Sequence, residues 1–237
     1  EAHTWNYEYE STMRQLDYGA TVVPIFTGEW HSGGWSSGYS SYADATFPNA
    51  SEMVNFDTLE VYAYNPCDEH RQRYSKGDGS YGGCHEWDYL HYLKICDADN
   101  SSNCDTEFVR YITSYGREGR WLSDITPYMW MIQDGGERRF KYSGANKMGL
   151  HIYALLFNFN ESTVAAGSEY AFSGGQFRGD YNNESQYKRS HVFTPPANTI
   201  KVEIVATITG HGFSQDSANC AEFCDHEHHF YLDGNHA

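Results

Sequence analysis

The sequence predicts an all-β protein of the sandwich type. Several segments place apolar residues at every second position, which is the period of a half-buried strand. The 237-residue chain has 20 tyrosines and 22 glycines, and turn-forming clusters such as SKGDGSYGG (75–83) separate the alternating segments. No long amphipathic helix is indicated, so the pattern favours sandwich strands joined by turns.

Two segments before residue 160 carry most of this prediction. In 57–64, Leu59, Val61 and Ala63 share one face. The segment 148–159 (MGLHIYALLFNF) is apolar on both faces and suits a central strand, although periodicity alone leaves a buried helix open.

Three further strands are expected, at 88–96, 106–113 and 199–209. In the last of these, TIKVEIVATIT, Val202 and Ile204 alternate with Lys201 and Glu203. This segment is therefore predicted to be a half-buried strand.

The first fifty residues are rich in Gly, Ser, Tyr and Trp, as in GEWHSGGWSSGYSSY (28–42). They suit either a partner-binding extension or an ordered sheet edge with long loops. The aromatic side chains need burial, which favours the ordered edge. A polar, glycine-rich stretch at 160–186 marks the expected domain boundary.

The charge of the chain limits its partners. It has 16 basic and 32 acidic residues, a formal net charge of −16. Such a charge repels phosphate backbones and anionic membrane surfaces, so nucleic acid is not an expected partner. The longest apolar run is far too short to span a bilayer, and the sequence opens on Glu1 rather than on a signal peptide. We therefore expect a mature, soluble, secreted chain with no membrane insertion.

The six cysteines fall into neighbouring pairs along the sequence. Cys67 lies near Cys84, Cys96 near Cys104, and Cys220 near Cys224. The even number and short separations favour three disulfides and an oxidising compartment over a zinc site, since no CxxC pair is present. Four glycosylation sequons support secretion weakly; they lie at Asn49, Asn100, Asn160 and Asn183.

Two acidic side chains stand in cysteine-bounded segments far apart in the sequence. Asp88 lies in GCHEWDYL (83–90), and Glu222 lies between two cysteines in NCAEFC (219–224). Rigidly held carboxylates of this kind can activate water and assist a leaving group in amide hydrolysis. For any single acid, a solvated surface charge is the simpler interpretation.

These segments resemble the bacterial peptide-N-glycosidase F family of amidases, which remove N-linked glycans from asparagine. The resemblance runs over about residues 20–237 and is most specific in the combination of EWD (86–88) with TGHG and CAEFC (209–224). It implies two jelly-roll β-sandwiches side by side with the active site in the groove between them. The expected parts are an N-terminal extension (1–19), a first jelly roll (20–163) and the start of a second (164–237).

The resemblance also implies roles for individual residues. Asp88 matches the principal catalytic aspartate and Glu222 the second essential acid. The substrate-binding side would be lined by Glu86, Trp87, Tyr89 and His211. The substrate would be an N-glycoprotein or its glycan, hydrolysed at the GlcNAc–Asn linkage without any cofactor.

The sequence departs from the family at several points. A third functional glutamate and a nearby tryptophan of the family fall on Gly144 and Asn146 here. Tyr89 replaces an arginine, and His211 replaces a tryptophan. The second sandwich is also incomplete by resemblance, so either another chain or an extracellular assembly completes it, or this sequence is part of a longer polypeptide.

The histidine-rich segment CDHEHHFYLDGNH (224–236) suggests a different chemistry. On a strand His226 and His228 share one face and could ligate a metal. Copper-dependent monooxygenases have a similar twin-sandwich architecture, but their second copper site has no counterpart here. Metal binding is therefore the weaker interpretation.

Two functions of different class remain open from the sequence. The first is a secreted amidase that uses Asp88 to activate the attack and Glu222 to assist it. The second is a non-catalytic extracellular glycoprotein that keeps the scaffold for glycan or protein contact, as the missing third acid suggests. The amidase is the preferred label.

Overall fold

The computed structural model describes residues 4–5, 19–33, 40–70, 72, 74–161, 165–171, 182–186, 188–210, 223 and 225–236. The chain divides into two units, one of residues 1–169 with 203–209 and one of residues 170–202 with 210–237. The predicted all-β fold class is confirmed in the described part. The helical elements there are short: α2 (Ala50–Met53), η1 (Asp68–His70), η2 (Thr126–Ile132) and η3 (Glu184–Gln186).

The first unit contains a five-stranded sheet in which all neighbours run antiparallel. In spatial order its strands are β1 (Thr4–Trp5), β9 (Gly119–Asp124), β4 (Thr58–Asn65), β11 (Met148–Phe157) and β2 (Thr21–His31).

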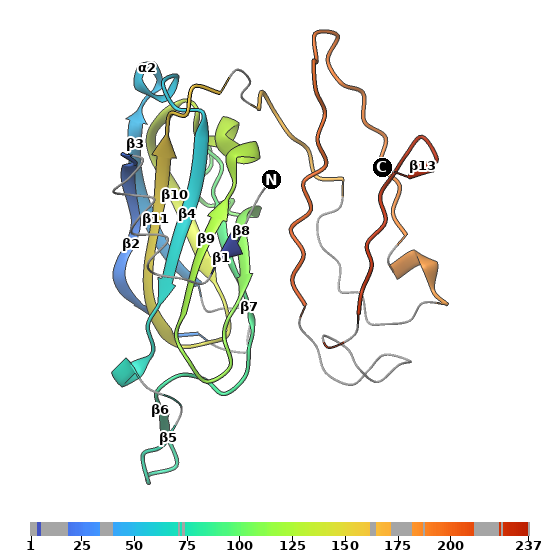
Figure 1. Ribbon diagram of the computed structural model, residues 1–237. Helices are drawn as coiled ribbons and strands as arrows, with labels where there is room; N and C mark the ends of the chain where they lie inside the picture. The colour runs from blue at the N-terminus through green and yellow to red at the C-terminus, as the bar shows by residue number, and fades with distance from the viewer. Residues whose placement is uncertain are drawn as a thin grey trace. The chain divides into compact units, whose positions relative to one another are not determined.

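A second antiparallel sheet of four strands packs on the first. Its strands are, in spatial order, β3 (Ser40–Asn49), β10 (Gly135–Ser143), β7 (Leu90–Ile95) and β8 (Thr106–Ile112). Figure 1 shows the two layers as a sandwich.

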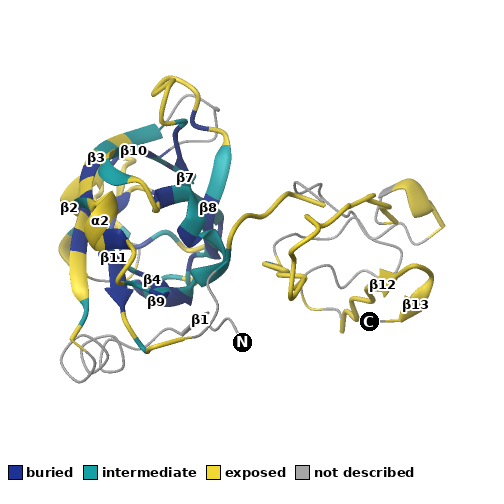
Figure 2. Cartoon of the chain, turned by 90° about the horizontal axis from the view of Figure 1, so that it is seen from above, coloured by how far each residue is buried: buried dark blue, intermediate teal, exposed yellow. Residues whose placement is uncertain are grey.

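The core lies between these sheets. Phe26 of β2 and Tyr142 of β10 meet across it with ring centroids 6.2 Å apart. Leu59 and Ile152 from one sheet and Leu93 from the other are fully buried in the same cluster. Figure 2 shows this buried interior in dark blue. Because each strand gives every second side chain to this space, the alternation in the sequence correctly indicates the sandwich.

The strand predictions before residue 160 are confirmed. The segment 57–64 forms β4, and 148–159 forms β11, which has β4 on one side and β2 on the other. The strands expected at 88–96 and 106–113 are β7 and β8. The ordered-edge interpretation of the N-terminal region holds as well, because β2 and β3 are each the last strand of a sheet.

The strand predicted at 199–209 is not formed. Residues 188–210 form neither helix nor strand, and Figure 1 draws them as a plain tube without an arrow. The alternating side chains are exposed rather than half-buried, with Ile200 82 % and Val202 55 % exposed. A strand needs a neighbour to pair with its backbone groups, and none of the described segments pairs with this one.

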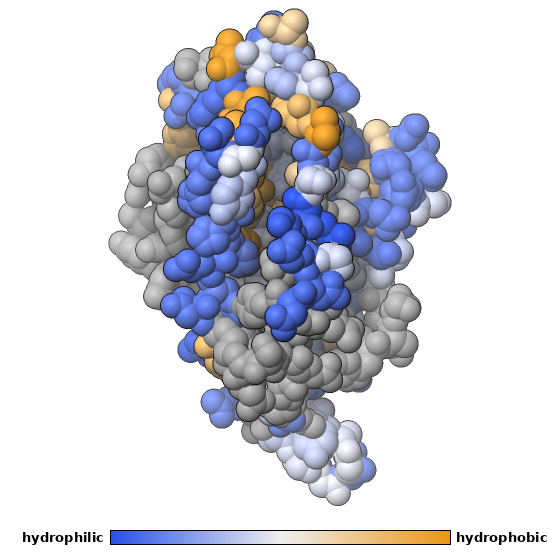
Figure 3. All heavy atoms as spheres, turned by 90° about the vertical axis from the view of Figure 1, so that its right-hand side faces the viewer, coloured by the Kyte–Doolittle hydropathy of each residue, from blue (hydrophilic) through white to orange (hydrophobic). Residues whose placement is uncertain are grey.

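The described part of the second unit is mostly exposed (Figure 2). Its paired strands are the two of one hairpin, β12 (Tyr231–Leu232) and β13 (Asn235–His236). On the face that Figure 3 shows, hydrophobic side chains form small separate groups among hydrophilic ones. In the described part of the chain, no helix has both the length and the apolar character of a bilayer span.

Candidate functional site

Two of the three predicted disulfides are present. Cys67 is bonded to Cys84 and Cys96 to Cys104. The first closes a loop that carries the small hairpin of β5 (Tyr74–Ser75) and β6 (Tyr81–Gly82). The third expected pair, Cys220 with Cys224, lies outside the described residues.

Asp88 lies between the Cys67–Cys84 disulfide and strand β7, and it is only 6 % exposed. The residue after it is held on both sides by one threonine. The Tyr89 amide donates to Thr113 Oγ1 at 2.9 Å, and the Thr113 amide donates to the Tyr89 carbonyl at 3.0 Å. The backbone beside Asp88 is therefore fixed to the end of β8, which suits a residue that needs a defined position.

Asn146 extends this connection to the segment between β10 and β11. Its Nδ2 donates to Thr113 Oγ1 at 3.1 Å, so the threonine hydroxyl accepts two hydrogen bonds. Asn146 is 3 % exposed. Asn146, which is expected from the resemblance to stand at the family's tryptophan position, thus holds the segment beside Asp88.

The two aromatic neighbours of Asp88 point to different environments. Trp87 is 56 % exposed, whereas Tyr89 is buried with its ring 5.1 Å from that of His85. Exposed indole rings are suited to stacking on sugars or other flat apolar surfaces. Of the two rings proposed from the sequence for substrate contact, Trp87 is the one at the surface.

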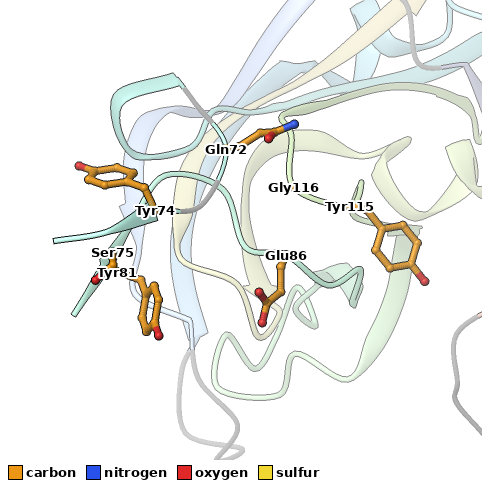
Figure 4. Close-up of a pocket in the computed structure, with 7 residues that line it drawn as sticks. All are labelled: Gln72, Tyr74, Ser75, Tyr81, Glu86, Tyr115 and Gly116. Carbon is orange, nitrogen blue, oxygen red and sulfur yellow. The ribbon is translucent and has the colours of Figure 1, made fainter. Parts of the chain in front are cut away.

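Glu86 lines an open cleft of about 360 Å³. Figure 4 shows its carboxylate between the tyrosines of the β5–β6 hairpin and Tyr115 on the opposite bank. The full lining is Gln72, Tyr74, Ser75, Tyr81, Glu86, Tyr115 and Gly116. A carboxylate, an amide and phenol rings offer both hydrogen bonds and flat apolar surface, which is the mixed character of ligand sites.

Glu118 holds the chain that leads into the β5–β6 hairpin on one side of this cleft. Its carboxylate accepts hydrogen bonds from Tyr64 Oη at 2.8 Å, from the Cys67 amide at 3.1 Å and from His70 Nδ1 at 2.6 Å. Burial raises the pKa of Glu118, but these hydrogen bonds outweigh it, and the pKa is lowered overall. The chain at Glu69 and His70 adopts positive φ angles of 54° and 49°, so this anchor also holds a strained turn.

Gly144, which the resemblance is expected to place at the family's third glutamate, has no room for a side chain. A Cβ atom built there would overlap the ring of His91. His91 is fully buried, and its Nδ1 is hydrogen-bonded to the hydroxyl of Tyr142. Tyr142 in turn accepts from Tyr111 at 2.9 Å, and its own hydrogen can go to His91 Nδ1 or to Met148 Sδ, which lies 3.7 Å away.

A second buried histidine adjoins this chain of hydrogen bonds. His31 lies 3.0 Å from the Gly144 carbonyl through Nε2 and 2.9 Å from Ser41 Oγ through Nδ1. A carbonyl only accepts, so Nε2 carries the hydrogen. Burial lowers the pKa of His31 against the opposing effect of the Gly144 carbonyl, and burial together with the nearby His31 lowers the pKa of His91 to about 3. Both imidazoles are therefore neutral at physiological pH.

The remaining predicted site residues are not joined to this site by the structure. Glu222 and His211 lie outside the described residues, so the meeting of Asp88 with Glu222 stays a prediction. His226 and His228 are both exposed. Among the described residues, no three or more His, Cys, Asp or Glu side chains are grouped to hold a metal ion.

The four predicted glycosylation asparagines are on the surface: Asn49, Asn100, Asn160 and Asn183 are all exposed. In two of them the sequon serine already contacts the asparagine. Ser51 Oγ donates to Asn49 Oδ1 at 2.5 Å, and Ser185 Oγ donates to Asn183 Oδ1 at 2.6 Å. Their use as acceptors remains a prediction.

Sequence reasoning missed the inward-facing polar residues of the sandwich. On β7, His91 lies on the same face as Leu93 and Ile95, so the alternation of buried positions could have identified it as a core residue. Thr113 and Tyr115 carried no comparable signal, because only the folded loop after β8 brings them next to residues 86–89.

Comparison with known proteins gives a family match over the C-terminal part of the chain. Residues 180–237 match the family model described as Peptide-N-glycosidase F, C terminal. No curated protein matches. Among solved structures, peptide-N-glycosidase F, a glycosylasparaginase from Flavobacterium meningosepticum, aligns with a TM-score of 0.41 and 16 % identity. That alignment covers 58 % of this chain and 42 % of the bacterial chain. Residues 180–237 are therefore similar to the C-terminal part of the peptide-N-glycosidase F family.

Proposed function

We propose that this protein is an extracellular amidase that hydrolyses the GlcNAc–Asn linkage of N-glycoproteins. The observation that carries the proposal is the position of Asp88. It is a buried carboxylate beside a fixed backbone segment, one residue from the exposed indole of Trp87 and two residues from Glu86, which lines the cleft. The family match of residues 180–237 supports the same activity. The two disulfides suit an oxidising, extracellular environment.

In this proposal Asp88 accepts a proton from the water that attacks the asparagine side-chain carbonyl. The carbon–nitrogen bond then breaks, the peptide keeps an aspartate, and the glycan leaves as a glycosylamine. Glu222 assists proton transfer to the leaving nitrogen. Trp87 supplies a flat surface for the sugar, and Glu86 provides hydrogen-bond acceptors in the adjoining cleft.

A second candidate function is favoured by one specific observation. The position expected to bear a third acid is Gly144, and His91 fills the space that a side chain would need. Asn146, two positions on, is committed to Thr113. A protein with these replacements can bind N-glycans on the same surface without cleaving them.

One assay separates the two functions. The protein is incubated with a denatured N-glycoprotein, and peptide mass spectrometry follows conversion of glycosylated asparagine to aspartate. Turnover supports the amidase. Glycopeptide binding without any conversion supports the non-catalytic function, and neither binding nor conversion contradicts both.

A further inference from the structure

The C-terminal hairpin places two imidazole rings nitrogen to nitrogen. His229 Nδ1 lies 3.0 Å from His236 Nε2, and the ring centroids are 5.3 Å apart at an interplanar angle of 61°. The turn between the strands has positive φ at Asp233 and Gly234, as hairpin turns of the Asp-Gly type require. This turn fixes the register in which His236 stands opposite Tyr231.

The protonation of this pair follows from a neighbouring carboxylate. Glu227 Oε2 lies 3.3 Å from His229 Nε2, which favours the tautomer with the hydrogen on that nitrogen. His229 Nδ1 then presents a lone pair to His236. In the metal-free pair, His236 supplies the hydrogen between the two rings. A metal ion can replace that hydrogen if His236 also presents a lone pair.

The separation of the two nitrogens suits a shared metal ion. Zinc–imidazole bonds of about 2.0–2.1 Å at a tetrahedral centre place the two nitrogens roughly 3.3 Å apart. The observed 3.0 Å therefore needs an opening of only a few tenths of an ångström. A carboxylate on the far nitrogen of a ligating histidine is also the usual orienting partner at such sites.

We propose that His229 and His236 together bind a divalent transition-metal ion such as Zn²⁺, with Glu227 orienting His229. The His229 side chain is 50 % exposed, so water completes the coordination. The ring of His236 is also held by Tyr231, whose ring centroid lies 5.4 Å away. The bound ion links the two sides of the hairpin through these two side chains. This pair is distinct from His226 and His228, and its use is independent of the amidase activity.

Calorimetric titration of the tag-free, full chain with ZnCl₂ alone tests the site. We expect one ion per chain for the parent. His229→Ala and His236→Ala should each lose binding or weaken it about 10-fold or more, because one of two protein ligands is gone. Glu227→Gln should weaken it by about 10- to 100-fold, the usual cost of losing an orienting partner. The matched controls His226→Ala and His228→Ala should bind as the parent does.

All of these side chains are exposed, so the variants are expected to fold, which circular dichroism checks. The proposal is overturned if the parent binds no zinc. It is also overturned if His229→Ala and His236→Ala bind as the parent does, or if binding is lost in the His226 or His228 variant instead.

Discussion

Gly144 and His91 share one space, because a Cβ atom on residue 144 would overlap the His91 ring. Strands β10 and β7 pair at Ser143 with Tyr92, so these two residues come next in the same antiparallel ladder. The inward position of the His91 ring thus depends on the absence of a side chain at Gly144. Residue 144 therefore faces a filled interior rather than an open groove.

Replacement of Gly144 by alanine should destabilise the first unit. The added methyl group must displace the His91 ring inside a packed core, which costs about 1–3 kcal/mol of unfolding free energy. Urea unfolding followed by fluorescence measures the change. Gly167→Ala is the matched control, because a Cβ there meets no atom within 4 Å. Equal stability of the two variants would show that the His91 ring moves aside at no cost in unfolding free energy, which would contradict the prediction.

Acid should destabilise the protein through His91. Burial and the neighbouring His31 lower its folded pKa to about 3, whereas an unfolded histidine titrates near about 6.5. The unfolded chain therefore takes up this proton first. Its contribution to stability is complete above about pH 6.5 and is lost towards pH 3 at about 1.4 kcal/mol per pH unit.

The His91→Asn variant isolates this dependence, since its amide oxygen can still accept from Tyr142. Chemical unfolding at several pH values should show a shallower loss of stability than in the parent. Some slope should remain, because the pKa of His31 is also lowered. The exposed His228→Asn control should keep the parent slope. A His91→Asn slope identical to the parent's would refute the assignment.

Asp57 ties the end of β11 to the start of β4. Its carboxylate accepts from the amides of Phe159 and Glu161 at 2.9 and 2.8 Å and from the Thr58 hydroxyl at 2.9 Å. Burial raises the pKa of Asp57, but these hydrogen bonds outweigh it and the pKa is lowered. The stabilisation is therefore present above the unfolded value of about 3.9 and is lost as the pH falls through the folded pKa.

Asp57→Asn should accordingly reduce the unfolding free energy at pH 7 by about 1.5–3 kcal/mol, the range for hydrogen bonds to a charged group. The difference from the parent should shrink in acid below about pH 3.9. Thermal unfolding at neutral and acid pH measures both. The exposed Asp105→Asn variant serves as the control. A deficit that is the same at every pH would rule out the charge as its source.

The Cys67–Cys84 disulfide should be the more stabilising of the two described. It closes a separation of 17 residues, against 8 for Cys96–Cys104. Chain entropy predicts about 3 kcal/mol for the longer loop and somewhat less for the shorter. Paired serine replacements and unfolding measurements compare them, after non-reduced peptide mapping confirms the connectivity. A larger loss from the shorter loop would mean that contacts, not loop closure, dominate.

The sequence predicts the sandwich well because its strands obey period two. β11 was recognisable from apolar residues on both faces, and it proves to lie between β4 and β2. The 199–209 segment shows the limit of this reasoning. Alternation reports which side chains suit a strand, but a strand also needs a backbone partner, and local sequence does not supply one.

The candidate site was only partly predictable for a similar reason. Asp88 and Trp87 were found because they stand in a short motif with a cysteine. Thr113 and Asn146, which hold the neighbouring backbone, come from the segment after β8 and the segment between β10 and β11, and they were not assigned this role. Such long-range hydrogen bonds depend on the register of the sheets, which no local pattern specifies.

The central claim is that Asp88 activates the attack on the GlcNAc–Asn linkage. The most direct measurement compares kcat/KM and glycopeptide Kd for the parent, Asp88→Asn and the exposed control Asp105→Asn. We predict that Asp88→Asn lowers kcat/KM by about 10²- to 10⁴-fold, as loss of a general base does, with little change in Kd. Asp105→Asn should match the parent. An inactive parent, or an Asp88→Asn variant with the parent's kcat/KM, would contradict this account.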